Sequence, residues 1–204
     1  MNILRTARIA TPALAALTLT LALAGPASAD PAFVMRNGSQ INFAALPGES
    51  NNVTFSISGG FLQVSDAANA LTPGLGCVQF GNPNTVRCGL AAGVTRIQAS
   101  LGDRDDVATN NTAIPSDLVG GEGDDVLVGG SGADRLTDAD GWNASPGATL
   151  TFDGRGGNDT VLSRNGGFDR INCGENTGDF DMLLADSATL DAVVPSTCEF
   201  VQRF

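Results

Sequence analysis

The chain has 204 residues and a formal net charge of −11, with 22 acidic and 11 basic residues and no histidine or tyrosine. Such acidity disfavours nucleic acid and anionic membrane surfaces, because phosphate groups would be repelled, and it leaves cations as natural partners. The absence of histidine excludes Ser–His and Cys–His catalytic pairs and imidazole metal ligands. We therefore expect a binding or structural protein that is not an enzyme. A glycosidase-type carboxylate pair is the remaining catalytic option. The sequence does not favour it, because no two acids are isolated among apolar residues.

The first residues have the pattern of a secretory signal peptide. A segment with two arginines, 1–8, precedes an apolar run, 9–24, and the small residues 26–29 form an A-x-A cleavage site. The alternative is a membrane anchor, but the run is short for a span and contains Pro12. We expect residues 1–29 to be removed and the remainder to be secreted to the extracellular space, with no membrane span.

Residues 30–100 have the pattern of short β-segments separated by turns. A Gly-Gly pair separates the alternating runs 53–58 and 61–65, which is a strong hairpin signal because glycine tolerates the positive φ of two-residue turns. Residues 94–101 form a further predicted strand. This region is therefore predicted to be an N-terminal β-meander.

Four cysteines in an exported chain predict two disulfides. Two of them flank the turn-forming tetrad 81–84, and antiparallel pairing of Phe80 with Thr85 would place them directly opposite each other. The other two would then close the second loop. The predicted disulfides are Cys77–Cys88 and Cys173–Cys198.

From Leu101 onward, glycine and aspartate recur at regular intervals before one or two aliphatic residues. Two uninterrupted nine-residue copies occupy 120–137, and a third occupies 154–162. The interruption between them holds Asp138 and Asp140, which we expect in a mobile loop rather than in a catalytic pair. Each copy combines six turn residues with three strand residues, of which one large aliphatic points inward. Stacked coils would bury these aliphatics as a ladder: Leu127, Leu136, Val161 and Ile171.

Such a repeat gathers the oxygen ligands that calcium prefers. Calcium takes six to eight hard oxygens, a mixture of carboxylates and carbonyls. One turn supplies half of that shell, so the turn stacked beside it must supply the rest. Two nonapeptides make one coil, so Asp106 and Asp125, which are 19 residues apart, can frame one site. Asp134, on the opposite edge, is expected to face the region of Asp153.

The tandem copies resemble the hemolysin-type calcium-binding (RTX) repeat of secreted bacterial proteins. The resemblance extends to the L-G-D-x-D-D segment at 101–106 and to the D-x-I-x-C-G segment at 169–174. It implies that the sixth-position aspartates and the main-chain oxygens of the glycine turns bind Ca²⁺. The positions implied as metal ligands are Asp106, Gly120, Gly121, Gly123, Asp125, Gly129, Gly130, Gly132, Asp134, Gly157 and Asp159.

The whole pattern predicts an all-β protein with a short right-handed parallel β-roll. The predicted parts are a signal peptide (1–29), a β-meander (30–100), the roll (101–186) and a disulfide-tied C-terminal cap (187–204). The expected function is extracellular calcium binding by a monomer, with cell-surface or matrix partners of unspecified kind. The alternative is a metal-free structural or adhesive surface solenoid, because its turns would need glycine and aspartate in any case.

Overall fold

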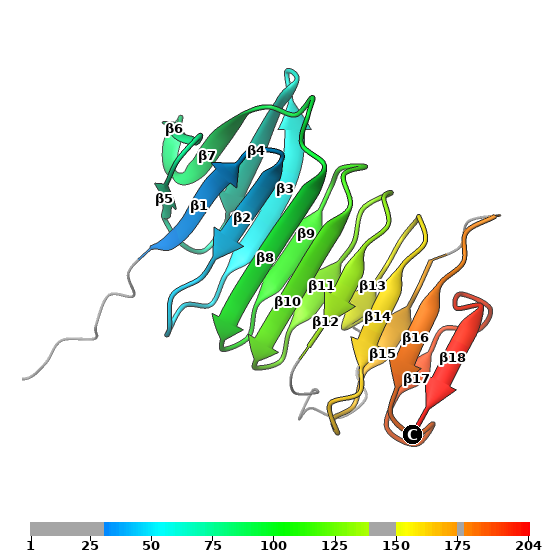
Figure 1. Cartoon of the computed structure of the whole chain (residues 1–204). Coiled ribbons are helices and arrows are strands. Elements are labelled where there is room, and N and C mark those ends of the chain that lie inside the picture. The colour runs from blue at the N-terminus through cyan, green and yellow to red at the C-terminus, as the bar shows by residue number, and fades with distance from the viewer. Residues whose placement is uncertain (1–30, 139–149, 175–177) are drawn as a thin grey trace, which may run out of the picture.

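The computed structural model describes residues 31–138, 150–174 and 178–204, and over these ranges the fold is all-β without any helix (Figure 1). The predicted signal peptide and Asp140 lie outside the described residues. The strands form two nine-stranded sheets, called here sheet A and sheet B. Sheet A contains β1 (Ala32–Asn37), β2 (Gln40–Ala44), β5 (Leu71–Pro73), β8 (Arg96–Asp103), β10 (Ser116–Glu122), β12 (Arg135–Thr137), β14 (Thr160–Ser163), β16 (Met182–Ala185) and β18 (Phe200–Arg203). Sheet B contains β3 (Asn52–Ser58), β4 (Phe61–Asp66), β6 (Val78–Phe80), β7 (Asn82–Leu90), β9 (Val107–Asn110), β11 (Val126–Val128), β13 (Phe152–Asp153), β15 (Arg170–Asn172) and β17 (Ala192–Val193).

From β8 onward the chain alternates between the sheets, and each strand pairs in parallel with the strand one coil before it. This is the predicted parallel β-solenoid, visible in Figure 1 as a stack of strands that ends at β18. Parallel pairing already begins at β2 with β8 and at β3 with β9, and it continues through β17 and β18. The stack therefore extends beyond the interval 101–186 at both ends, and the segment predicted as a cap continues the coil.

Antiparallel strands extend both sheets at the N-terminal end of the stack. The predicted Gly-Gly hairpin is confirmed: Ser58 pairs with Phe61, and Gly59 and Gly60 have φ values of 59° and 82°. The strand predicted at 94–101 is confirmed as β8, which begins two residues later and continues to Asp103.

Both predicted disulfides are present and join Cys77 to Cys88 and Cys173 to Cys198. The predicted pairing of Phe80 with Thr85 is wrong, because β7 already begins at Asn82 and Phe80 pairs with that residue across an irregularity in register. The remaining residues of β6 keep the predicted register, so the cysteines still lie opposite each other.

The core is a double ladder of apolar side chains between the two sheets. All four aliphatics predicted to point inward are fully buried. Phe152, at the end of the interruption, fills the core position between Leu127 and Ile171 in sheet B. Burial of one such side chain contributes roughly 1.5–3 kcal/mol, so repetition of the ladder in every coil stabilises the narrow fold.

Candidate metal centre at the corners of the solenoid

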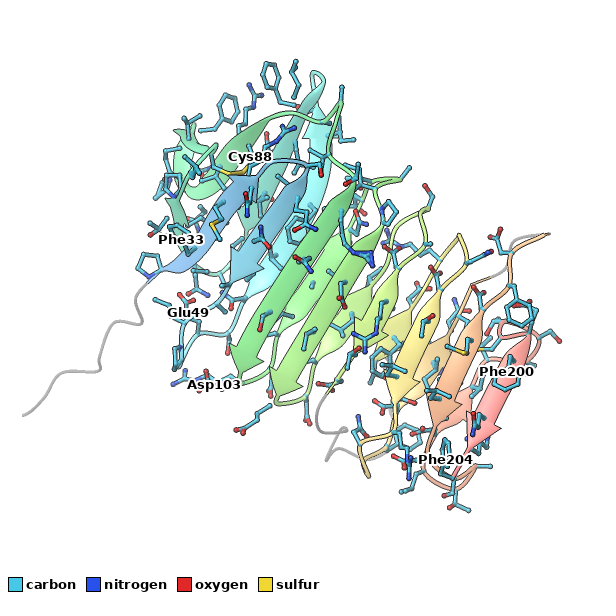
Figure 2. The ribbon with its side chains drawn as sticks, in the orientation of Figure 1. Phe33, Glu49, Cys88, Asp103, Phe200 and Phe204 are labelled. Atoms are coloured by element: carbon cyan, nitrogen blue, oxygen red, sulfur yellow. A yellow bond between two sulfur atoms is a disulfide. The ribbon has the colours of Figure 1, made fainter. Side chains whose placement is uncertain are left out.

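The chain turns between the sheets at two corners of each coil. The A-to-B corner consists of the turns after β2, β8, β10, β12, β14 and β16, and the B-to-A corner consists of the turns after β9, β11, β13, β15 and β17. Figure 2 shows Glu49 and Asp103 at the A-to-B corner, where the Gly48 N–H donates to Asp103 Oδ1. In most turns the residue directly before the next strand is acidic. These residues are Asp106, Asp125, Asp169 and Asp191 at the A-to-B corner, and Asp134, Asp159, Asp181 and Glu199 at the B-to-A corner.

The acidic residues form a hydrogen-bonded series that we call the carboxylate ladder. Except for Asp169, which accepts from Asn165 Nδ2 at 3.1 Å, each carboxylate accepts a bond from the main-chain N–H of the equivalent residue one coil earlier. At the B-to-A corner four such bonds follow one another: Ser116 to Asp134 (2.6 Å), Asp134 to Asp159 (2.8 Å), Asp159 to Asp181 (2.8 Å) and Asp181 to Glu199 (2.7 Å), with the donor named first. At the A-to-B corner, Asp106 accepts from Asn51 (2.6 Å), Asp125 from Asp106 (2.9 Å) and Asp191 from Asp169 (3.2 Å).

In three of these carboxylates the other oxygen is buried without a hydrogen-bond partner. The atoms are Asp106 Oδ2, Asp159 Oδ2 and Asp169 Oδ1. Burial, together with repulsion from neighbouring aspartates, raises the pKa of Asp106 to about 7, of Asp159 to about 8 and of Asp169 to about 7. These groups are therefore costly as bare anions, and a proton or a metal ion would relieve that cost.

Asp134 is differently placed, because protein donors engage both of its oxygens. Its Oδ1 accepts from the N–H and the hydroxyl of Ser116, both at 2.6 Å, and from Asn110 Nδ2 at 3.4 Å. Its Oδ2 accepts from the Gly130 N–H at 2.5 Å. Asp134 thus joins two coils through its own hydrogen bonds, in a way that requires no metal ion.

The expectation that Asp134 faces Asp153 is wrong. The Asp134 N–H donates to Asp159, 25 residues away, because the interruption after β12 lengthens this coil beyond two nonapeptides. Asp153 instead lies in β13, where its Oδ1 accepts from Asn172 at 3.0 Å. The four predicted aspartate ligands therefore form two stacked pairs on opposite corners, Asp106 with Asp125 and Asp134 with Asp159.

The expectation that Asp138 lies in a mobile loop is wrong, because this residue is buried at the A-to-B corner with an exposed fraction of 6%. Its Oδ1 accepts from the Gly121 N–H at 3.3 Å. Burial raises the pKa of Asp138 to about 8, and repulsion from Asp125 and a hydrogen bond between the two carboxyls act in the same direction. Sequence reasoning missed this residue because it lies outside the nonapeptide copies.

The predicted glycines pack against two kinds of oxygen. A Cβ at Gly121 would lie 2.0 Å from the Gly102 carbonyl oxygen, and one at Gly157 would lie 2.3 Å from that of Gly132. Gly123, Gly130 and Gly132 meet carbonyls of the neighbouring coil in the same way. A Cβ at Gly120 would instead clash with Oδ2 of Asp125 in its own turn. A Cβ at Gly129 would meet both kinds of oxygen, the Gly154 carbonyl at 2.6 Å and Asp134 Oδ2 at 2.7 Å. Glycine thus brings main-chain oxygens and carboxylates together at each corner.

Replacement of Gly157 by alanine should destabilise the protein by about 3 kcal/mol. The new methyl group would collide with the Gly132 carbonyl, and φ at this position is +107°. Gly166→Ala is the matched control, because φ there is +86° but nothing lies within 4 Å of the added methyl group. The control should lose only about 1–2 kcal/mol through backbone strain. Equal losses in urea unfolding would show that the coils do not pack as closely as this.

The donor set of the corners fits a hard cation that takes most of its ligands from the main chain. Within the described ranges, no group of three or more Asp, Glu, Cys or His side chains converges on one point. A calcium ion here would therefore use one or two carboxylates and complete its shell with carbonyl oxygens and water, a mixture that calcium accepts. The buried oxygens without a hydrogen-bond partner, Asp106 Oδ2, Asp159 Oδ2 and Asp169 Oδ1, are carboxylate atoms available to such an ion.

Comparison of the chain with family models, curated proteins and solved structures finds no match of any of the three kinds. The similarity to RTX repeats therefore depends on the residue pattern alone. No helix suited to crossing a membrane occurs in the part of the chain that the structure describes. The two disulfides are typical of proteins from an oxidising, extracellular environment.

Proposed function

We propose that this protein is an extracellular calcium-binding protein whose corner turns hold Ca²⁺. The carboxylates that would bind it are Asp106, Asp125 and Asp159, together with carbonyl oxygens of the glycine turns. One observation carries the proposal. Asp159 uses one buried oxygen to accept the Asp134 N–H, while its other oxygen is equally buried and has no hydrogen-bond partner.

An unpartnered carboxylate oxygen inside a protein is costly, and a divalent cation offsets that cost better than a neutral donor does. The metal would bind the stacked coils and not the unfolded chain, so binding should stabilise the fold. Calcium would supply positive charge between acidic coils that otherwise repel one another. The net charge of −11 favours approach of the cation.

A second candidate is the metal-free structural or adhesive solenoid, and one observation favours it. The carboxylate ladder already joins successive coils, and Asp134 is satisfied without any ion. In that case aspartate would serve only as a hydrogen-bond acceptor for the preceding coil. In the calcium-binding function Asp106 and Asp159 bind a cation, whereas in the metal-free solenoid they do not.

Calorimetric titration of metal-free protein distinguishes the two candidates. Extracellular calcium modules bind at ~10⁻⁴–10⁻³ M, so the titration must reach several millimolar CaCl₂, with MgCl₂ as the comparison ion. We expect saturable heat with calcium that Asp106→Asn combined with Asp159→Asn abolishes. Asp117→Asn is the control, because this aspartate lies on sheet A and faces Arg135 at 3.4 Å. Absence of saturable heat, with equal melting in calcium and EDTA, would favour the metal-free solenoid.

We also propose that the protein is exported and that residues 1–29 are removed on the way. The two disulfides support this, because they form in oxidising compartments. The intact mass of protein recovered outside the producing cells should correspond to a chain that begins at Asp30. A mass that retains the N-terminal segment would contradict cleavage.

A further inference from the structure

Within the described residues, the outermost strands at the C-terminal end of the solenoid pair on one side only. Among the described strands, β18 stands last in sheet A and β17 last in sheet B. The core is uncovered there, because Val201 pairs with the fully buried Leu183 and yet is itself 40% exposed. Figure 2 shows Phe200 and Phe204 at the same end, and they are 44% and 56% exposed. An edge strand of this kind can pair with another strand.

The hydrogen bonds of β18 show which of its main-chain groups point outward. The Phe200 N–H donates to the Asp181 carbonyl at 3.0 Å, so the groups of Phe200 face β16. Main-chain groups alternate sides along a strand, and those of Gln202 therefore also face β16. The groups that face away from the solenoid belong to Glu199, Val201 and Arg203. In sheet B, Ala192 and Val194 donate toward β15, which leaves the groups of Val193 facing outward at the same end.

We infer that a second copy of this chain covers this edge, with the two β18 strands antiparallel about a two-fold axis at Val201. In this register Val201 of each copy exchanges both main-chain hydrogen bonds with Val201 of the other. Glu199 of each copy then lies opposite Arg203 of the other, so opposite charges meet on both sides of the axis. Within one copy Glu199 Oε2 accepts from the Asp181 N–H at 2.7 Å and Arg203 Nη1 donates to the Asp186 carbonyl at 3.0 Å, so the contact would use their remaining oxygen and N–H groups. Glu199, Val201 and Arg203 lie on the same face of β18, the face on which Val201 continues the core beyond Leu183. The cores of the two copies would therefore become continuous.

Neighbouring registers are worse on the same criteria. A two-fold axis at Gln202 would still allow main-chain hydrogen bonds, between Val201 of one copy and Arg203 of the other. It would however place each Val201 opposite a charged residue and leave Glu199 without a basic residue opposite it. An axis at Glu199 or at Arg203 would place two like charges directly opposite each other and leave Val201 uncovered. Apolar contact and charge therefore select the register centred on Val201, and they select a second copy, because the strand is complementary to itself. This pairing does not depend on calcium.

Cysteine cross-linking tests both the partner and the register. Hydrogen-bonded antiparallel pairs have Cα atoms about 5.5 Å apart, within the range of a disulfide. Val201→Cys should therefore give a covalent dimer under mild oxidation, with the new bond located by peptide mapping. Gln202→Cys is the matched control, since its copies would lie at a diagonal distance of about 7–8 Å and should not cross-link. Equal cross-linking of both variants, or of neither, would overturn the proposal.

Charge reversal gives an independent test by sedimentation equilibrium of the mature chain. The unaltered protein should be a dimer, and Arg203→Glu should weaken the dimer about tenfold by placing two pairs of acids opposite each other. Arg203→Lys keeps a positive charge opposite Glu199 and should therefore keep the association. Glu199 itself is left unaltered, because its carboxylate accepts the Asp181 N–H. Arg135→Glu, in the middle of the solenoid, should leave association unchanged. A monomer at all concentrations, or a dimer unaffected by Arg203→Glu, would overturn the proposal.

Discussion

Metal-free protein should lose stability as the pH rises from about 4 to about 8, and millimolar calcium should restore it. The pKa values of Asp106, Asp159 and Asp169 are raised to about 7, 8 and 7 from an ordinary value of 3.8. The folded state therefore holds protons over this interval that the unfolded state has released. Under that condition stability falls with rising pH. The stabilisation is complete below about pH 4 and is lost as the pH passes through 7 to 8.

Thermal melting in EDTA and in several millimolar CaCl₂, at pH values between 4.5 and 8.5, checks this expectation. Without calcium the Tm should fall by about 5 °C or more across the series, since several carboxyls act in the same direction. Calcium should raise the Tm most at pH 8, where the carboxylates are free of protons, and least at pH 4.5, where protons compete for the same oxygens. A Tm in EDTA that is flat or rises with pH would contradict the buried, unpartnered carboxylates.

Asp159→Asn and Asp134→Asn should have opposite effects on the metal-free protein at pH 8. At position 159 the new amide can still accept the Asp134 N–H through its oxygen, while the cost of a bare buried anion disappears. The first variant should therefore be more stable than the unaltered protein in EDTA, and calcium should stabilise it only through the opposite corner, at Asp106 and Asp125. At position 134 an amide must turn its NH₂ group toward either Ser116 or Gly130, both of which donate to the carboxylate. The second variant should lose about 2–3 kcal/mol, with or without calcium.

Urea unfolding of both variants in EDTA and in calcium measures these differences. The two residues are equivalent in successive coils of one corner, so they serve as controls for each other. If both variants were destabilised equally in EDTA, the unpartnered oxygen of Asp159 would not be a site of uncompensated charge. If Asp159→Asn kept the full calcium response, the ion would have to bind elsewhere.

Much of the fold could be predicted because it depends on local rules repeated in every coil. The inward aliphatics, the Gly-Gly hairpin and both disulfides follow from spacing and from the conformational range of glycine. What could not be predicted depends on how the interruption is accommodated. It makes one coil 25 residues long, which pairs Asp134 with Asp159 rather than with the region of Asp153. It also buries Asp138 beside Asp125, and no periodic signal marks that position.

The sequence predicted which residues lie at the corners, but it did not predict the hydrogen bonds that they form. All four aspartates proposed as ligands are buried at the corners, as the nine-residue pattern suggests. Their hydrogen bonds to the preceding coil were not foreseen, although the acids stand directly before each strand, where such a bond can form. The pattern therefore located the oxygens, while the contacts between coils determine which of them are already engaged.

The direction of the carboxylate ladder has a consequence for how the solenoid is completed. In every rung the donor belongs to the earlier coil and the acceptor to the later one, from Asn51 with Asp106 to Asp181 with Glu199. A coil that has just left the ribosome or a secretion channel thus has an unsatisfied corner until its successor arrives. Growth is polar, and loss of the last winding would expose the one before it, so unravelling should proceed backward from the C-terminus.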